Sequence, residues 1–235
     1  MRSPTVHILE VWGDFACFTS PMKVERWSYP VITPSAARGI FDAIYVKPTK
    51  FRWQIDRIEV LSEPKTIALR RNEVKEKGPS EREVAEWSAG RKEIEPIFVD
   101  ATDDTKGRTQ RQTMALQNVR YRLHAHIVRW PSALNDPDDF DAQFRRRVDH
   151  GKCAFQPCFG MREFPAYFEF AQGEADLWKG DLDLGWMLYD VFDLGQPGTK
   201  FAPARVSLFR AELRDGVLEV PPYESDQVRK GVPRR

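Results

Sequence analysis

The stretch Val119–Ile127, VRYRLHAHI, alternates strictly between apolar or small side chains and basic ones. Such a period of two is typical of a β-strand whose two faces meet different surroundings. One face would carry valine, tyrosine, leucine, alanine and isoleucine. The other face would carry Arg120, Arg122, His124 and His126. The stretch therefore predicts a sheet with one face in the core and one basic face.

The basic character begins before this strand. No acidic residue occurs between Asp104 and Asp136, although the whole chain is nearly neutral, with 36 Lys and Arg, 35 Asp and Glu and a net charge of +1. The cations that precede the strand are Lys106, Arg108 and Arg111. A one-sided stretch in a neutral chain predicts a local surface for an anion, and an open sheet face of this kind suits RNA. The alternative is a solvated strand whose charges bind nothing.

Before the strand, the pattern predicts a strand near 6–18, a helix over about 34–46 and a strand near 53–60. Thr33-Pro34 is a typical helix start, with a hydroxyl at the cap and proline at the first helical position. Residues about 75–95 predict an excursion with a short helix.

After the strand, Asn135-Asp136-Pro137 should cap a helix in which Phe140, Phe144 and Val148 share one face. Arginines 145–147 lie in its last turn, where they suit the helix dipole. Asp215-Gly216 should form the turn of a late hairpin.

This order predicts an α+β protein with a ferredoxin-like, RNA-recognition-like β-α-β-β-α-β domain over residues 1–185. An insertion over about 75–105 interrupts that domain. A small antiparallel β-sheet domain and a basic tail would fill residues 186–235.

The composition limits the other classes of function. Hydrophobic residues make up 41% and charged residues 30%, as in ordinary globular proteins. The chain has no apolar run long enough for a membrane span and no signal-peptide pattern, which predicts a cytoplasmic protein without a membrane partner. The three cysteines lack metal-ligand spacing, and no motif for a nucleotide, a metal or another cofactor occurs, so we expect none.

Several segments together carry a family resemblance. They are Gly13–Phe18 (GDFACF), Thr33–Ile40 (TPSAARGI), Ala43–Tyr45 (AIY), Arg108–Arg111 (RTQR) and Gly160–Phe164 (GMREF). In order and character these segments resemble the Cas-five proteins of CRISPR systems, and most of all subtype d, which belongs to type I-C systems. The match spans most of the chain.

The resemblance implies a function. Subtype d proteins are endoribonucleases that cut the repeat hairpin of precursor crRNA without a metal. A ribose 2′-OH attacks the adjacent phosphate, giving a 2′,3′-cyclic phosphate and a free 5′-OH. The proteins then remain in the interference complex beside its backbone-forming and large subunits. Precursor crRNA and those subunits are therefore the expected partners.

The resemblance also implies catalytic residues. The family uses a tyrosine at the end of the signature helix, where this chain has Tyr45, and a lysine-histidine pair on the segment that here reads Gln110-Arg111-Gln112. Arg111 can stabilise a phosphate but exchanges protons poorly near neutral pH. Three alternatives stay open: Tyr45 and Arg111 suffice, His124 or His126 takes the missing role, or cutting is weak.

The remaining cations are expected to contact RNA. This set comprises Lys23, Arg38, Lys106, Arg108, Arg120 and Arg122. With Tyr45, the basic surface near residues 105–128 should form one continuous seat for ribose-phosphate. An alternative function is a noncatalytic subunit that caps the guide RNA, and a weaker one is binding of duplex DNA.

Overall fold

The computed structural model describes residues 4–20, 26–74, 78–94, 108–134, 136, 139–198 and 204–232. Lys23, Lys106 and the side chain of Arg108 lie outside these described residues. The chain divides into two compact units. The larger unit comprises residues 1–67 and 114–235, and the smaller unit comprises residues 68–113.

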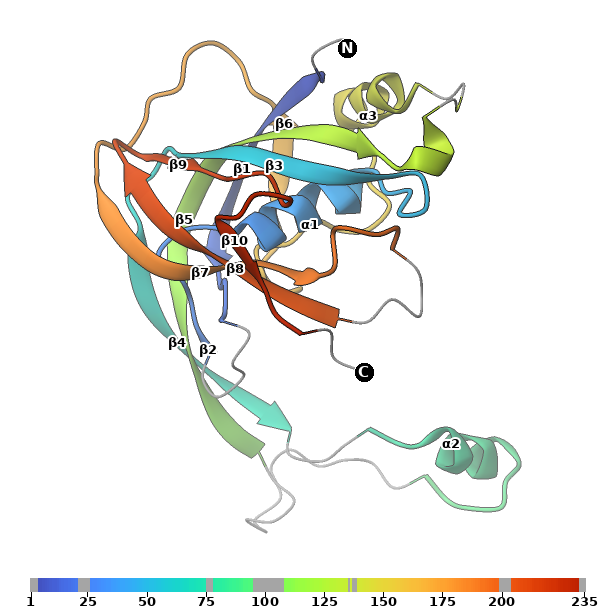
Figure 1. Ribbon diagram of the computed structural model, residues 1–235. Helices are drawn as coiled ribbons and strands as arrows, with labels where there is room; N and C mark the ends of the chain where they lie inside the picture. Colours follow the sequence, from blue (N-terminus) through green and yellow to red (C-terminus); the bar gives the residue numbers. More distant parts are fainter. Residues whose placement is uncertain are drawn as a thin grey trace. The chain divides into compact units, whose positions relative to one another are not determined.

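Over its described residues the protein is α+β, as the sequence predicts, with a mostly antiparallel sheet of ten strands (Figure 1). The strands are β1 (Val6–Ala16), β2 (Arg26–Trp27), β3 (Phe51–Val60), β4 (Lys65–Val74), β5 (Arg108–Arg129), β6 (Tyr167–Phe170), β7 (Leu182–Phe192), β8 (Ala204–Arg214), β9 (Val217–Glu219) and β10 (Val228–Lys230). Their main order is β10-β8-β9-β3-β5-β1-β6, while β2 and β4 pair with β5 and β7 pairs with β8. The predicted domain boundary at 185/186 falls within β7 and stays a prediction.

The central strand β5 confirms the alternation read from Val119–Ile127. Tyr121, Leu123 and Ala125 are buried, and β1 and β3 flank the strand on its two sides. The intervening basic residues point to the other face of the sheet, because successive side chains of a strand alternate. Local polarity was therefore sufficient to orient this strand.

Helices α1 (Pro34–Ile44) and α3 (Phe140–Asp149) cover the apolar face. The indole of Trp53 on β3 lies between them, with ring centroids 4.9 Å from Phe41 of α1 and 4.6 Å from Phe144 of α3. Trp53 pairs with Ile127 across the strands, which places both helices on the face opposite the basic side chains. A short 3-10 helix, Pro131–Ala133, leads from β5 toward α3.

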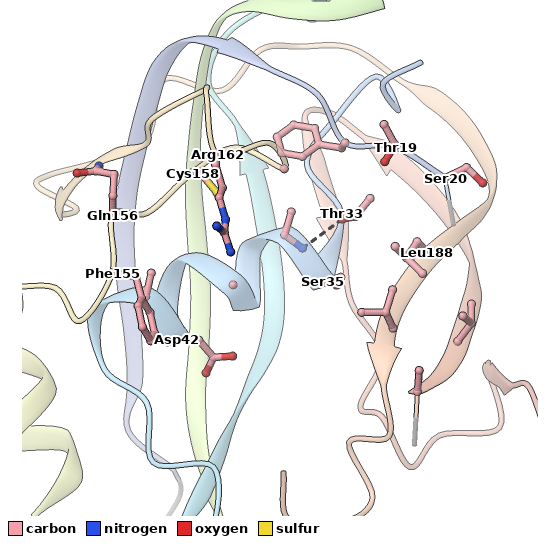
Figure 2. Close-up of a pocket in the computed structure, with 18 residues that line it drawn as sticks. Thr19, Ser20, Thr33, Ser35, Asp42, Phe155, Gln156, Cys158, Arg162 and Leu188 are labelled. Carbon is pink, nitrogen blue, oxygen red and sulfur yellow. Dashed lines mark hydrogen bonds between the residues drawn. The ribbon is translucent and has the colours of Figure 1, made fainter. Parts of the chain in front are cut away.

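The helix and hairpin ends show which local predictions were correct. Thr33 caps α1, as predicted, because its Oγ1 accepts a hydrogen bond from the Ala36 N–H (Figure 2). The Asp215-Gly216 turn is also confirmed, with φ values of +48° and +77° that suit a two-residue hairpin. The predicted cap of α3 is wrong. Asp139, rather than residues 135–137, accepts the hydrogen bond of the first turn.

The smaller unit contains the end of β4, helix α2 (Glu81–Ser88) and the start of β5. The short helix predicted in the excursion is thereby confirmed. Ser80 and Glu83 cap it reciprocally through side chain and backbone. None of the helices in the described residues has the length and apolar character to cross a bilayer.

Candidate active site

The basic face of β5 is largely neutralised by carboxylates from other strands. Arg120 Nε lies 2.7 Å from Glu10 Oε1, and Arg122 Nε lies 2.9 Å from Glu10 Oε2. Arg122 also donates to the backbone carbonyls of residues 172–174 and is buried. Its guanidinium therefore binds the protein's own polar groups, while Arg120 remains half-exposed.

The two histidines of this face have acidic neighbours on β3. His124 Nε2 lies 3.1 Å from Glu59 Oε1, and His126 Nδ1 lies 2.8 Å from Asp56 Oδ2. These carboxylates are about 65 to 70 residues away in the sequence, so the acid-free stretch around β5 gave no sign of them. The catalytic role suggested for either histidine stays a prediction.

The Glu10 cluster makes a testable contribution to stability. Burial raises the pKa of Glu10, but hydrogen bonds and charges from Arg122 and Arg120 outweigh it and hold the pKa below its ordinary value of 4.5. A carboxyl whose pKa is lowered in the folded state stabilises the fold above its unfolded pKa, and loses this effect as the pH falls through the folded value. We expect Glu10→Gln to unfold in less urea than wild type at pH 7 and the difference to shrink as the pH is lowered below 4.5. A difference that grows as the pH falls below 4.5 would contradict this assignment.

Arg38 is also held inside the fold. Its Nε lies 2.7 Å from Asp190 Oδ2 on β7, and its Nη1 contacts Asp42 one helical turn further along α1. Burial raises the pKa of Asp42 despite this arginine. An RNA contact by Arg38 would have to compete with a buried ion pair. In the smaller unit, Arg111 Nε lies 3.0 Å from Glu73 Oε2.

Tyr45 follows the last residue of α1, and tertiary hydrogen bonds fix that end of the helix. The Ala43 carbonyl accepts from the N–H of Ala154 at 2.7 Å. The Ile44 carbonyl accepts from Arg147 Nη1 of α3 at 3.1 Å. Because the last carbonyls of a helix lack partners within it, these donors anchor the segment on which Tyr45 lies.

The hydroxyl of Tyr45 is buried and has no hydrogen-bond partner among the described residues, and only 7% of the residue is exposed. The three other buried tyrosines of the described chain each have one: they are Tyr121, Tyr189 and Tyr223. Leaving a buried hydroxyl unpaired costs about 1–3 kcal/mol, so such a group requires an explanation.

Tyr45 lines a pocket of about 450 Å³ between the ends of α1 and α3. The lining residues are Tyr45, Lys47, Gln143, Arg146, Arg147 and Lys152. Four of these six are cationic and none is acidic. The Arg147 guanidinium lies over the tyrosine ring, 5.5 Å from its centroid. The pocket therefore combines a tyrosine side chain with positive charge.

A larger pocket of about 980 Å³ lies between α1, the loop around residues 155–162 and strands β7 and β8 (Figure 2). Its ionisable side chains are Asp42, Cys158 and Arg162. Asp42 is engaged with Arg38, and burial raises the pKa of the Cys158 thiol, which keeps it protonated. This pocket has no counterpart to the phenol and the cation cluster beside α3.

The prediction that Tyr45 and the basic surface of β5 form one continuous binding surface for ribose-phosphate is wrong. Tyr45 lies with the helices on one face of the sheet, whereas Arg120, Arg122 and the two histidines lie on the other. Sequence reasoning missed the cations that do line the tyrosine pocket. The sequence feature that could have indicated them is the arginine triplet 145–147. The dipole of the helix that carries the triplet was sufficient to explain it, so no second role was predicted. A pattern within one helix could not show that α3 ends beside Tyr45.

Comparison with known proteins identifies the family. A sequence model of the family described as CRISPR-associated protein (Cas_Cas5), named Cas_Cas5d, matches residues 8–221. The CRISPR pre-crRNA endoribonuclease Cas5d of Mannheimia succiniciproducens is 41% identical over 232 residues, covering 94% of this chain and 97% of the relative. The protein of the same name from Thermus thermophilus is 40% identical over 226 residues, covering 91% and 90%.

Solved structures agree at the level of the fold. A crystal structure described as a CRISPR-associated protein aligns with a TM-score of 0.61 at 19% identity, covering 96% of this chain and 97% of that one. The functionally uncharacterized protein SMU1763c from Streptococcus mutans aligns with a TM-score of 0.60 over the same shares. The motifs read from the sequence, the family match and the two relatives lead to one conclusion: this chain belongs to the Cas5d family of CRISPR-associated proteins.

Proposed function

We propose that this protein is a metal-independent endoribonuclease that cleaves CRISPR repeat hairpins in precursor crRNA. One observation in the structure carries the proposal: Tyr45, whose buried hydroxyl has no hydrogen-bond partner, lines a pocket whose described lining residues include four cations and no carboxylate. Membership of the Cas5d family and the names of both relatives support the same activity.

The proposed reaction is a transesterification within the RNA. The ribose 2′-oxygen loses its proton and forms a bond to the adjacent phosphorus, the bond from phosphorus to the 5′-oxygen breaks, and that oxygen gains a proton. The products are a 2′,3′-cyclic phosphate and a free 5′-OH. Tyr45 is the proton-transfer group of this scheme, because a positioned phenol can exchange a proton with a reacting oxygen. Contributions of Arg111, His124 or His126 stay predictions.

The arrangement of the strands supports the finer fold assignment. The order β3-β5-β1-β6, with α1 after β1 and α3 after β5, is the one expected for a ferredoxin-like β-α-β-β-α-β unit. We propose that this unit holds the cut RNA within a cytoplasmic type I-C interference complex, next to the backbone and large subunits. The half-exposed Arg120 and the exposed arginines of the smaller unit are candidates for further RNA contacts.

The alternative is a subunit that caps the guide RNA without cutting it. The absence of a histidine from Gln110-Arg111-Gln112, together with the covered hydroxyl of Tyr45, favours this alternative. The geometry without RNA does not decide against catalysis, because catalytic contacts often form only in the complex with substrate.

Incubation of the protein with its cognate repeat RNA in excess EDTA tests the proposal. We expect the hairpin to be cut once, with a product that carries a 2′,3′-cyclic phosphate. Replacing the 2′-OH at the cut by hydrogen should abolish the product, because the nucleophile is then missing. Cleavage that needs magnesium would overturn the mechanism, and RNA that is bound but uncut would favour the capping subunit.

A further inference from the structure

We infer that Arg146, Arg147 and Lys152, together with Lys47, bind the scissile phosphate of the RNA beside Tyr45. This inference rests on the proposed endoribonuclease function and extends it to the groups that stabilise the charge on phosphorus. Attack by a 2′-OH builds negative charge on the phosphate oxygens, and cations placed around them lower the barrier. In this chain α3, the segment after it and Lys47 after α1 supply those cations, and a contribution of Arg111 stays a prediction.

Three of these cations have no carboxylate partner among the described residues. Within the described residues, no ion pair involves Arg146, Arg147 or Lys152, whereas Arg38, Arg120 and Arg122 all have acidic partners. Like charges held together without counterions destabilise a fold. A neutral chain that gathers cations around one pocket therefore favours an anionic ligand there.

The end of α3 does not need these side chains as caps. The Arg146 carbonyl accepts from His150 Nδ1–H at 2.7 Å. The Arg147 and Val148 carbonyls accept from backbone N–H groups of the residues that follow the helix. The negative end of the helix is thus already satisfied, which leaves the guanidinium and ammonium groups available.

Within the pocket, Arg147 has a positioning role as well. Nη1 donates to the Ile44 carbonyl, and the guanidinium carbon lies over the ring of Tyr45. A guanidinium offers five N–H donors, so Arg147 keeps donors for a phosphate while it holds the end of α1. Arg146 and Lys152 are exposed and contribute charge with little packing. We therefore place the phosphate between these two side chains and the phenol.

The test uses a double variant that carries both Arg146→Ala and Lys152→Ala, and compares it with the single variant Arg145→Ala. Arg145 belongs to the same helix and is equally exposed, but it does not line the pocket. In single-turnover cleavage of the repeat hairpin at saturating protein, we expect the double variant to be about 100-fold slower than wild type, as for loss of preorganised charge in other active sites. Arg145→Ala should cut at the wild-type rate.

Binding of a repeat RNA with 2′-deoxyribose at the cut separates this inference from the proposed function. The logarithm of the affinity decreases linearly with the logarithm of the salt concentration. For the double variant this decrease should be less steep, by about 0.7 for each phosphate that the variant no longer neutralises, and for Arg145→Ala it should be unchanged. If the wild-type protein never cuts RNA, the proposed nuclease activity is refuted. The salt dependence of binding would still show whether these cations bind a phosphate. A double variant that matches Arg145→Ala in salt dependence overturns the inference. The inference is also overturned if the double variant shows a weaker salt dependence but cuts at the wild-type rate, because the phosphate bound would then not be the one that is cut.

Discussion

Tyr45→Phe should slow cleavage of the repeat RNA by about 10²- to 10⁴-fold, the usual contribution of a proton-transfer group. Only the hydroxyl oxygen is removed, and the ring that packs 5.4 Å from Phe51 and under Arg147 stays in place. The measurement is the single-turnover rate with protein in excess, so that weaker binding does not hide the chemical step.

The same substitution should not lower the free energy of unfolding. The Tyr45 hydroxyl is buried without a partner among the described residues, so its removal breaks no hydrogen bond there and relieves a desolvation cost of about 1–3 kcal/mol. Tyr167→Phe is a matched control, because Tyr167 is 53% exposed on β6 and lies outside the pocket. A Tyr45→Phe protein that cuts within 10-fold of wild type would remove this phenol from the mechanism.

Asp190→Ala should lower the free energy of unfolding by about 3 kcal/mol, the lower end of the range for breaking a buried ion pair. Asp190 is 1% exposed and binds the Arg38 guanidinium through both carboxylate oxygens. Its loss leaves a buried positive charge with Asp42 as the remaining partner, which places the effect at that lower end. Urea unfolding at pH 7 gives the value.

The control for this variant is Glu219→Ala, which removes one of the two acidic partners of Arg57, in an exposed pair. Exposed ion pairs contribute about 0.2–1 kcal/mol, so this variant should unfold near the wild-type midpoint. Equal unfolding midpoints for the two variants would show that the Arg38–Asp190 pair is solvated in solution. In that case the RNA contact predicted for Arg38 would become the better assignment.

Much of the fold could be read from short stretches. The alternation in Val119–Ile127, the Thr33-Pro34 cap and the Asp215-Gly216 turn are set by residues a few positions apart, and the structure confirms each of them. The cap of α3 was misplaced because two candidate sites for capping, residues 135–137 and Asp139, follow one another closely. The correct predictions and the misplaced cap all depend on interactions between near neighbours in the chain. The error in the position of the cap is therefore only a few residues.

Less of the candidate site than of the fold could be predicted from the sequence. Tyr45 was selected as a candidate through the resemblance of its segment to a family, whereas the residues around it in the structure were not predicted. The basic face of β5 looked open because its own segment has no acids, yet Glu10, Asp56 and Glu59 lie opposite its cations in the sheet. Arg147 suits the dipole of its own helix, yet it contacts the end of another.

The sequence by itself indicated the helices and the longer strands, their order, which face of the central strand is buried, and the family. Only the tertiary structure decided which charges are neutralised and which stay available to a ligand. The physical reason is the range of the forces: periodicity, caps and turns act between near neighbours in the chain, whereas ion pairs form between residues as distant as Glu10 and Arg122, 112 positions apart. The contact from Arg147 to the end of α1 spans 103 positions, so folding was needed to bring Tyr45 and its cations into one pocket.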